Sequence, residues 1–163
     1  MSKKIQLTQG KFAIVDDADY KWLNQWKWCA VKIGNTFYAV RNTPCKNGKR
    51  RMIWMHREIL CLPFGDSRIC DHQDRNGLNN QRGNLRMATC AQNLRNSKSR
   101  KGTSQFKGVS WYRDRAKWHA KIYVNGQQTN LGFFNSEVKA ARRYDEAAKM
   151  FFGEFAYINF GKE

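Results

Sequence analysis

Four polar residues in one part of the chain have the types and spacing of a site that could hydrolyse a phosphodiester bond. Asp71 and His72 are adjacent, Asn84 ends the polar loop that follows them, and Asn93 lies further along. Since the ordinary pKa of histidine is about 6.5, His72 suits the role of a general base that accepts a proton from water. The oxygens of Asp71 and Asn93 are the hard donors that Mg²⁺ prefers. These types predict a general base beside one divalent cation, Mg²⁺ or Mn²⁺, which would neutralise the phosphate and the leaving oxygen.

Two expected strands flank the loop that joins these residues. Residues 68–72 can form a strand that ends at the Asp71–His72 pair, and residues 86–88 can form a second strand. The sequence between them, DRNGLNNQRG, is rich in turn-forming residues. We expect Asn84, at the end of this loop, to hydrogen-bond across it and to hold His72 in place.

A helix is expected directly after the second strand. Thr89 and Gln92 have the spacing of a capping box, so the helix should begin there and carry Asn93 one turn inside it. A strand, loop, strand and helix of this size bring the end of the first strand against the first turn of the helix. Asp71 and Asn93 could then share one cation, with water and a phosphate oxygen in its other positions. The alternative is an ordinary turn without chemistry.

The composition favours a folded, basic protein with a polyanionic partner. The chain has 163 residues, 41% of them hydrophobic, which suits one medium domain or two small ones. Thirty Lys and Arg against thirteen Asp and Glu give a net charge of +17, for which nucleic acid is the first partner to consider. A membrane surface is the weaker alternative, because no apolar run approaches the roughly 20 residues of a membrane span. The N-terminus lacks the pattern of an export signal, which favours the cytoplasm.

The cysteines do not have the spacing of a disulfide framework. They stand at positions 29, 45, 61, 70 and 90, an odd number without any CxxC pair. We expect reduced, mostly buried thiols, and a structural zinc site is the less favoured alternative.

The first half of the chain is expected to be rich in strands. Strand patterns occur in three segments, residues 12–15, 28–33 and 37–41. A short helix is expected where Tyr20, Leu23 and Trp26 share one face, and a second helix over residues 54–62, before Pro63. The tryptophans at positions 22, 26 and 28 are expected in the core, with base stacking as the alternative.

The second half has the pattern of a three-stranded antiparallel sheet. Apolar and polar residues alternate strictly in KWHAKIYV, residues 117–124, and Asn125–Gly126 is a strong hairpin signal. A strand over residues 109–112 is expected before this segment. In the strand after the hairpin, Leu131 and Phe133 are expected on the apolar face.

A helix is expected to cover the apolar face of this sheet. Ser136 can cap it, and Gly153 can close it after about Phe152. Its alanines allow close packing on the sheet. The opposite sheet face, which is polar, basic and aromatic, would then be free to read a DNA groove.

A polar segment separates the two halves. The sequence NSKSRKGTS, residues 96–104, has no apolar residue and is expected to act as a linker. We therefore expect a first domain over residues 1–97, a linker over residues 98–104 and a second domain over residues 105–163. Residues 1–100 carry 19 Lys and Arg against 7 acidic residues, and the remaining residues carry 11 against 6. Both halves are thus able to approach the same polyanion.

The segment DHQDRNGLNNQRGNLRMATCAQN, with MHREIL upstream, resembles the HNH (ββα-metal) motif of phage and intron-encoded homing endonucleases. The resemblance, carried by residues 68–96, implies His72 as general base, Asn84 as the residue that braces the loop, and Asp71 and Asn93 as metal ligands. The last His of the motif is replaced here by Asn93, as in some homing members.

The sequence from FKGVSWYRDRAKWHAKIYVNG to FFGEFAYINF is similar over its whole length to the ERF-type DNA-binding domain of plant ethylene-response factors. Members read the major groove with the sheet face. The resemblance implies base contacts from seven residues: Lys107, Ser110, Tyr112, Lys121, Tyr123, Gln128 and Asn130. Arg113 and Arg115, in the loop before the second strand, are expected to contact phosphate. Ser110, Tyr123 and Asn130 stand where plant domains have Arg or Trp, so a plant target sequence does not follow.

Two further histidines leave alternatives open. His56, in the MHRE sequence, is interpreted as a residue for packing or phosphate contact rather than for catalysis. His119 lies on the exposed sheet face, where it either touches DNA or is simply solvated.

Together these features predict an α+β fold, with an N-terminal β-rich element and a ββα-metal nuclease core, followed by a small domain of three antiparallel strands packed on one helix. The predicted function is a site-specific homing endonuclease that acts as a monomer on double-stranded DNA. The resemblance to phage and intron-encoded enzymes implies that it works in the cytoplasm of a bacterial or phage-infected cell. The alternative is a regulator that binds DNA without cutting it. RNA binding is less favoured, because the polar sheet face lacks a cluster of stacking aromatic residues.

Overall fold

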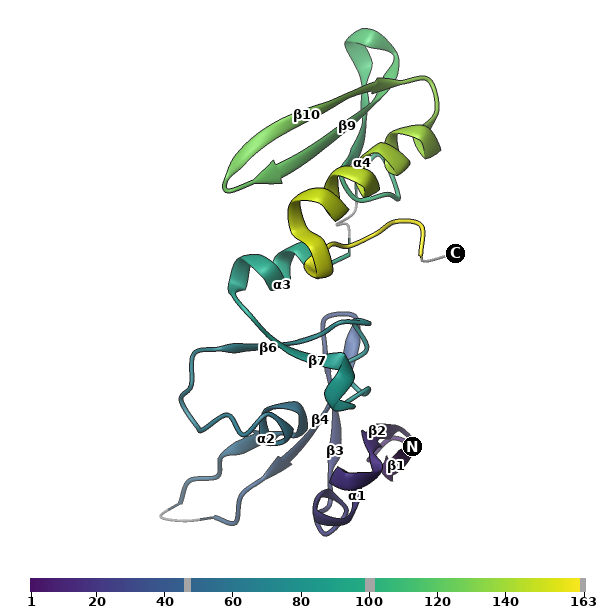
Figure 1. The fold of residues 1–163 in the computed structure, drawn as a ribbon. Coiled ribbons are helices and arrows are strands. Elements are labelled where there is room, and N and C mark those ends of the chain that lie inside the picture. Colours follow the sequence, from purple (N-terminus) through teal and green to yellow (C-terminus); the bar gives the residue numbers. More distant parts are fainter. Residues whose placement is uncertain (46–47, 99–101, 162–163) are drawn as a thin grey trace. The chain divides into compact units, whose positions relative to one another are not determined.

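The computed structural model describes residues 1–45, 48–98 and 102–161, and its fold is α+β. The chain divides into two compact units, Met1–Cys90 and Ala91–Glu163 (Figure 1). This division falls before the expected one at residue 97. Of the expected linker, residues 99–101 lie outside the described residues.

The described residues of the first unit form three small antiparallel sheets and two short α-helices. Its elements in chain order are β1 (Ser2–Gln6), β2 (Phe12–Asp16), α1 (Asp17–Leu23), β3 (Cys29–Ile33), β4 (Thr36–Asn42), β5 (Met52–Trp54), α2 (Met55–Ile59), β6 (Ile69–His72), η1 (Arg82–Asn84) and β7 (Leu85–Ala88). The sheets pair β1 with β2, β3 with β4 and β5, and β6 with β7. The expected strands and the helix near Leu23 are confirmed, and β1 and β5 are additions.

Helix α2 is shorter than expected. Trp54 pairs with Val40 in the sheet, so the helix begins only at Met55. After Ile59 the chain turns, and Cys61 adopts a left-handed φ of 53°, which a helix cannot accommodate.

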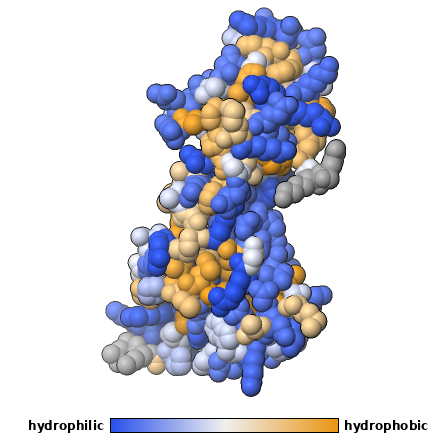
Figure 2. Space-filling view, in the orientation of Figure 1, coloured by the Kyte–Doolittle hydropathy of each residue, from blue (hydrophilic) through white to orange (hydrophobic). Residues whose placement is uncertain are grey.

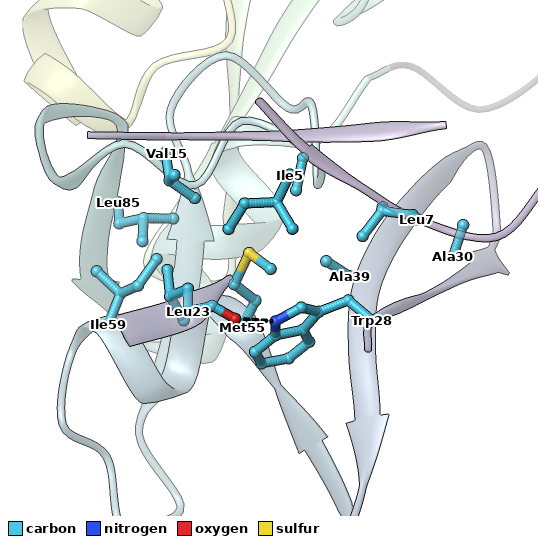
Figure 3. Packing of buried hydrophobic residues seen from close by; sticks show 11 residues of the cluster. Ile5, Leu7, Val15, Leu23, Trp28, Ala30, Ala39, Met55, Ile59 and Leu85 are labelled. Atoms are coloured by element: carbon cyan, nitrogen blue, oxygen red, sulfur yellow. Dashed lines mark hydrogen bonds between the residues drawn. The ribbon is translucent and has the colours of Figure 1, made fainter. Parts of the chain in front are cut away.

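A hydrophobic core joins the sheets and helices of this unit (Figure 3). Ile5, Leu23 and Met55 are fully buried, and the indole of Trp28 donates a 2.8 Å hydrogen bond to the carbonyl oxygen of Leu23. The expectation of three core tryptophans is wrong for Trp26, which is 44% exposed. Because α1 ends at Leu23, Trp26 lies beyond the helix.

The second unit consists of a three-stranded antiparallel sheet and helices. Its elements are α3 (Cys90–Asn96), which starts at the boundary, β8 (Val109–Tyr112), η2 (Arg113–Arg115), β9 (Lys117–Val124), β10 (Gln127–Phe134), α4 (Glu137–Phe152) and η3 (Gly153–Phe155). The central strand is β9. These elements confirm the expected sheet, the Asn125–Gly126 hairpin and the helix that follows Ser136.

Helix α4 packs on one face of this sheet through small residues. Ala140, Ala141 and Ala148 are completely buried, as is Ala120 of β9. The Ser136 side chain accepts a hydrogen bond from the Lys139 amide, as expected for an N-cap. This packing leaves the other sheet face to side chains such as Tyr123, which is exposed.

A β-bulge changes which residues of β10 face the core. The pairing with β9 shifts between Asn130 and Gly132, where Gly132 has a φ of 117° that favours glycine. After the bulge, Phe134 packs in the core, whereas Phe133 stacks on His119. The expectation that Leu131 and Phe133 share one face is therefore wrong.

Hydrophilic residues cover most of the visible surface of both units (Figure 2). Of the five free cysteines, four are exposed and Cys70 is half-buried, so the expectation of mostly buried thiols is wrong. None of the helices in the described part of the chain is long and apolar enough to span a membrane.

Candidate functional site

The β6–β7 hairpin places the Asp71–His72 pair at the start of a structured loop. His72 is the last residue of β6 and pairs with Leu85 of β7, and Asp71 pairs with Arg86. Residues 73–84 therefore form the connection between β6 and β7.

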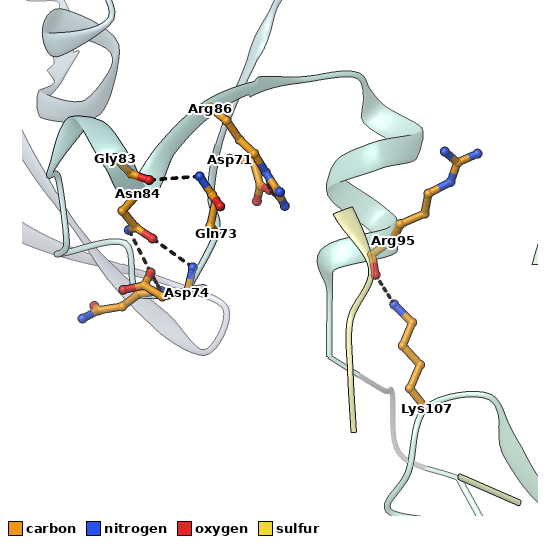
Figure 4. Close-up of polar contacts among 9 residues, drawn as sticks. Asp71, Gln73, Asp74, Gly83, Asn84, Arg86, Arg95 and Lys107 are labelled. Atoms are coloured by element: carbon orange, nitrogen blue, oxygen red, sulfur yellow. Dashed lines mark hydrogen bonds and ion pairs between the residues drawn. The ribbon is translucent and has the colours of Figure 1, made fainter. Parts of the chain in front are cut away.

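Asn84 makes hydrogen bonds across this loop. Its side-chain oxygen accepts from the Asp74 amide at 3.0 Å, and its side-chain nitrogen donates to the Asp74 carboxylate at 2.9 Å (Figure 4). The same nitrogen donates to the Asn79 carbonyl at 2.8 Å. The Asn84 carbonyl also accepts from the amide of Gln73 at 2.9 Å. These bonds fix the backbone that follows His72.

His72 is only 5% exposed and lies in a group of aromatic rings. Its ring centroid is 5.1 Å from that of His56 and 5.7 Å from that of Tyr38, both in edge-to-face orientation. The Nε2 atom of His72 lies 3.4 Å from the side-chain oxygen of Asn80, a residue with no exposed surface. Asn80, a residue that the sequence did not place at the site, thus contacts the imidazole.

Burial keeps the His72 ring neutral. It lowers the pKa of His72 below its ordinary value, and the hydrogen bond with Asn80 and the carboxylates of Asp74 and Asp71 oppose this effect in part. A neutral imidazole is the form that can accept a proton from water.

His56 is buried against the same ring. Burial lowers its pKa to about 3, with smaller contributions from His72 and Arg57. Its Nδ1 atom has no hydrogen-bond partner among the described residues. His56 therefore supplies a second neutral imidazole next to His72, in line with a packing role.

The carboxylate of Asp71 forms a buried ion pair. Both Nε and Nη2 of Arg86 donate to Oδ2 of Asp71, at 2.9 and 2.7 Å. The Asp71 side chain is 5% exposed, and the Arg86 side chain is 9% exposed. This pair holds the carboxylate at the end of β6 beside His72.

The N-terminal part of the chain anchors the loop from the other side. The carboxylate of Asp16 accepts from the Arg82 amide and from Gln81, and the Asp19 carboxylate binds the Arg82 guanidinium through two 2.8 Å hydrogen bonds. The backbone of Ile14 exchanges hydrogen bonds with Leu78 and Asn80. Strand β2 and helix α1 therefore position the loop that carries Asn80.

Glycine at position 77 lets this loop approach β4. A Cβ atom there would lie 2.5 Å from the carbonyl oxygen of Phe37 and 2.7 Å from the Tyr38 ring. Any larger residue would push the loop away from the ring that packs on His72.

Asn93 lies on α3, which starts at Cys90 as the Thr89 signal predicts. Asn93 belongs to the second unit, so its pairing with Asp71 stays a prediction. No group of three His, Cys, Asp or Glu within the described ranges could hold a metal. A carboxylate and an amide oxygen fit a hard cation that keeps water and phosphate ligands, and they do not fit a zinc site made of protein side chains.

The open sheet face of the second unit carries paired polar side chains. Tyr123 donates to Gln128 at 2.7 Å, and Nε2 of His119 lies 3.0 Å from Oδ1 of Asn130. The rings of His119 and Phe133 are stacked, with centroids 4.5 Å apart. Neighbouring strands thus hold these side chains in fixed pairs.

The arginines of η2 flank this face. The guanidinium of Arg115 lies 4.5 Å from the centroid of Phe133, and Arg113 is exposed. Tyr112 packs by its edge on Phe133, while Ser110 and Lys121 are half-buried on β8 and β9. This set therefore lies on or beside the sheet.

Lys107 differs from the rest of the expected DNA contacts. Its ammonium group donates to the carbonyl oxygen of Arg95 at 2.7 Å (Figure 4). It also donates to the carbonyl oxygens of Leu94 and Ser97, at 3.2 and 2.6 Å. It therefore binds the C-terminal end of α3.

Three residues of the site were not predicted from sequence as parts of it: Tyr38, Asn80 and Arg86. Arg86 carried a signal, because it stands opposite Asp71 once the two strands are paired in register. Asn80 and Tyr38 carried none, since their contacts depend on how the loop packs on β4.

Comparison with known proteins gives two kinds of similarity. No family model matches the chain. An uncharacterised HNH endonuclease of Acanthamoeba polyphaga mimivirus is 31% identical over 151 residues, which cover 93% of this chain and 76% of that protein. An AP2-like ethylene-responsive transcription factor of Arabidopsis thaliana is 45% identical over 67 residues, and Protein 3.8 of Escherichia phage T7 is 41% identical over 70. The chain spans only 14% of the length of that plant protein and 58% of the phage protein.

Proposed function

The chain belongs to the HNH endonuclease family, and from this premise we propose that it is a site-specific DNA endonuclease of the homing type. The observation that carries the proposal is His72, a buried neutral imidazole at the end of β6, beside the Asp71 carboxylate and a loop braced by Asn84. A β6–β7 hairpin followed by α3 supports a ββα-metal core.

We assign the imidazole of His72 as the group that takes the proton from the attacking water. The side-chain oxygen of Asn80 lies 3.4 Å from Nε2 of this ring and helps to hold it in position. Tyr38 and His56 fix the plane of the ring.

Asp71 and Asn93 would hold one Mg²⁺ or Mn²⁺ ion. When bound, the ion would neutralise the phosphate and stabilise the leaving oxygen. Arg86 positions the Asp71 carboxylate by binding one of its oxygens. The exposed sheet of the second unit would read double-stranded DNA, and the net charge of +17 supports a polyanionic substrate.

Cleavage of a randomised DNA library, followed by sequencing of the ends, tests the proposal. With Mg²⁺ or Mn²⁺ the parent chain should cut, and with EDTA it should not. His72→Ala should lose about 10²- to 10⁴-fold in rate, as for a general base, with nearly unchanged DNA affinity. Cutting by His72→Ala at the parent rate, or full activity in chelator, would contradict the proposal.

The similarity to a plant transcription factor supports one alternative, a regulator that binds DNA without cutting it. The same assay separates the two functions. Specific binding by the parent chain without metal-dependent cleavage at any site would favour the regulator.

A further inference from the structure

The β-bulge in β10 fixes the orientation of the Asn130 amide. Oδ1 of Asn130 accepts a 2.9 Å hydrogen bond from the backbone amide of Gly132, two residues along the bulge. A backbone amide can only donate, so the oxygen end of the side chain is identified by this bond. Asn130 is exposed, and its amide plane is nevertheless tied to the strand.

His119 occupies the second lone pair of the same oxygen. Its Nε2 lies 3.0 Å from Oδ1 of Asn130, so in the neutral ring Nε2 carries the hydrogen. Stacking on Phe133, with planes 15° apart, holds the imidazole in place. A carbonyl oxygen has two lone pairs, and both are therefore used inside the protein.

Asn130 is left with only donors to offer to a ligand. Its Nδ2 group has no hydrogen-bond partner among the residues that the structure describes. Asparagine usually reads adenine by donating to N7 and accepting from N6 at once, which requires a free oxygen. Here that oxygen is occupied. In the major groove, guanine offers two acceptors, N7 and O6, and no donor.

We propose that Asn130 is a specificity-determining residue that reads guanine through its Nδ2 hydrogens, and that His119 is the positioning residue that blocks adenine by occupying Oδ1. This inference rests on the proposed reading of DNA by the open sheet face. Gln128 does not support such an assignment, because its partner, the Tyr123 hydroxyl, can both donate and accept.

The test is selection of bound sites from a randomised duplex library by the full chain, in EDTA to prevent cutting. The parent chain should prefer guanine at one position, by about fivefold or more. Asn130→Asp keeps an oxygen for Gly132 and His119 but replaces the donor with an acceptor, so guanine should be replaced by cytosine, whose N4 donates. His119→Ala should admit adenine at that position. Lys139→Ala, on the exposed side of α4, is the matched control and should leave the profile unchanged.

Replacing the selected guanine by 7-deazaguanine gives a second measurement that does not depend on protein folding. It should weaken binding of the parent chain and have little effect on Asn130→Asp. The inference is overturned if Asn130→Asp keeps the parent profile, or if the parent binds 7-deazaguanine sites equally well. If the open sheet face does not read DNA at all, Lys121→Ala and Gln128→Ala should also leave the profile of selected sites unchanged. This result would distinguish failure of the proposed function from failure of the Asn130 assignment.

Discussion

His72, the proposed general base, is held by side chains that do not themselves need to touch a substrate. Asn80 contacts Nε2 of His72, and His56 and Tyr38 pack on its ring. Two imidazoles 5.1 Å apart cannot both be charged without strong repulsion, and burial disfavours either charge. The site therefore favours neutral His72 at the cost of sensitivity to acid.

Acid sensitivity of the first unit follows from His56. Its pKa falls from 6.5 when unfolded to about 3 when folded, so between these values the unfolded chain binds a proton that the folded chain does not. The contribution of His56 to the free energy of unfolding should thus be fully present above pH 6.5 and should be lost progressively as the pH falls toward 3. One such group gives a slope of at most about 1.4 kcal/mol per pH unit.

Chemical denaturation at several pH values between roughly 5 and 7 measures this slope, above the range in which carboxylates titrate. His56→Leu should make the slope shallower, whatever it does to the stability at pH 7. His72, whose pKa is also lowered by burial, contributes in the same direction and remains in the variant. An identical slope in parent and variant would show that His56 is not neutral in the folded state.

At the scale of elements, α3 depends on its tertiary partners. A helix of seven residues is marginal alone, and here the Lys107 ammonium binds its last carbonyl groups while the Arg95 guanidinium lies 4.6 Å from the centroid of the Phe152 ring. Lys107 thereby supports the helix that carries Asn93.

Lys107→Met keeps the apolar stem and removes the ammonium group. Loss of a charged hydrogen-bond donor typically costs about 1.5 to 3 kcal/mol, so amide hydrogens of α3 should exchange roughly 10- to 100-fold faster. Amides in the middle of α4 serve as the internal control and should keep their protection. Unchanged exchange in α3 would mean that other contacts hold the helix.

Elements with a clear period or turn signal were predictable from the sequence. Strict alternation located β9, and Asn125–Gly126 located the hairpin, since both signals are local. The bulge at Gly132 was not predictable, because it shows only when β10 is paired, and it reversed Phe133 and Phe134. Asn84 was predictable from its position at the end of the loop. Asn80 was not, because its contact with His72 depends on how the loop packs.

At the scale of the whole molecule, we propose different functions for the two units, although both should attract DNA. Residues 1–100 and the remaining residues are both basic, so phosphate contacts should be spread along the chain. Affinity falls with salt by roughly 0.9 per neutralised phosphate on a log–log scale, whereas base contacts set sequence preference. Removal of the reader should therefore affect both quantities.

A chain that ends before Gly102 retains Asp71, His72, Asn84 and Asn93 but loses the sheet and the Lys107 ammonium. We expect it to cut DNA with Mg²⁺ at high concentration, with a flatter site profile and a smaller salt slope than the full chain. Full-length Lys139→Ala is the control, because it removes one exposed positive charge from α4 and keeps the sheet, and it should cut at unchanged sites. Sequencing of cleavage ends from a randomised library measures both profiles. If the shortened chain cuts with the parent profile, specificity comes from the first unit and the sheet is not the reader.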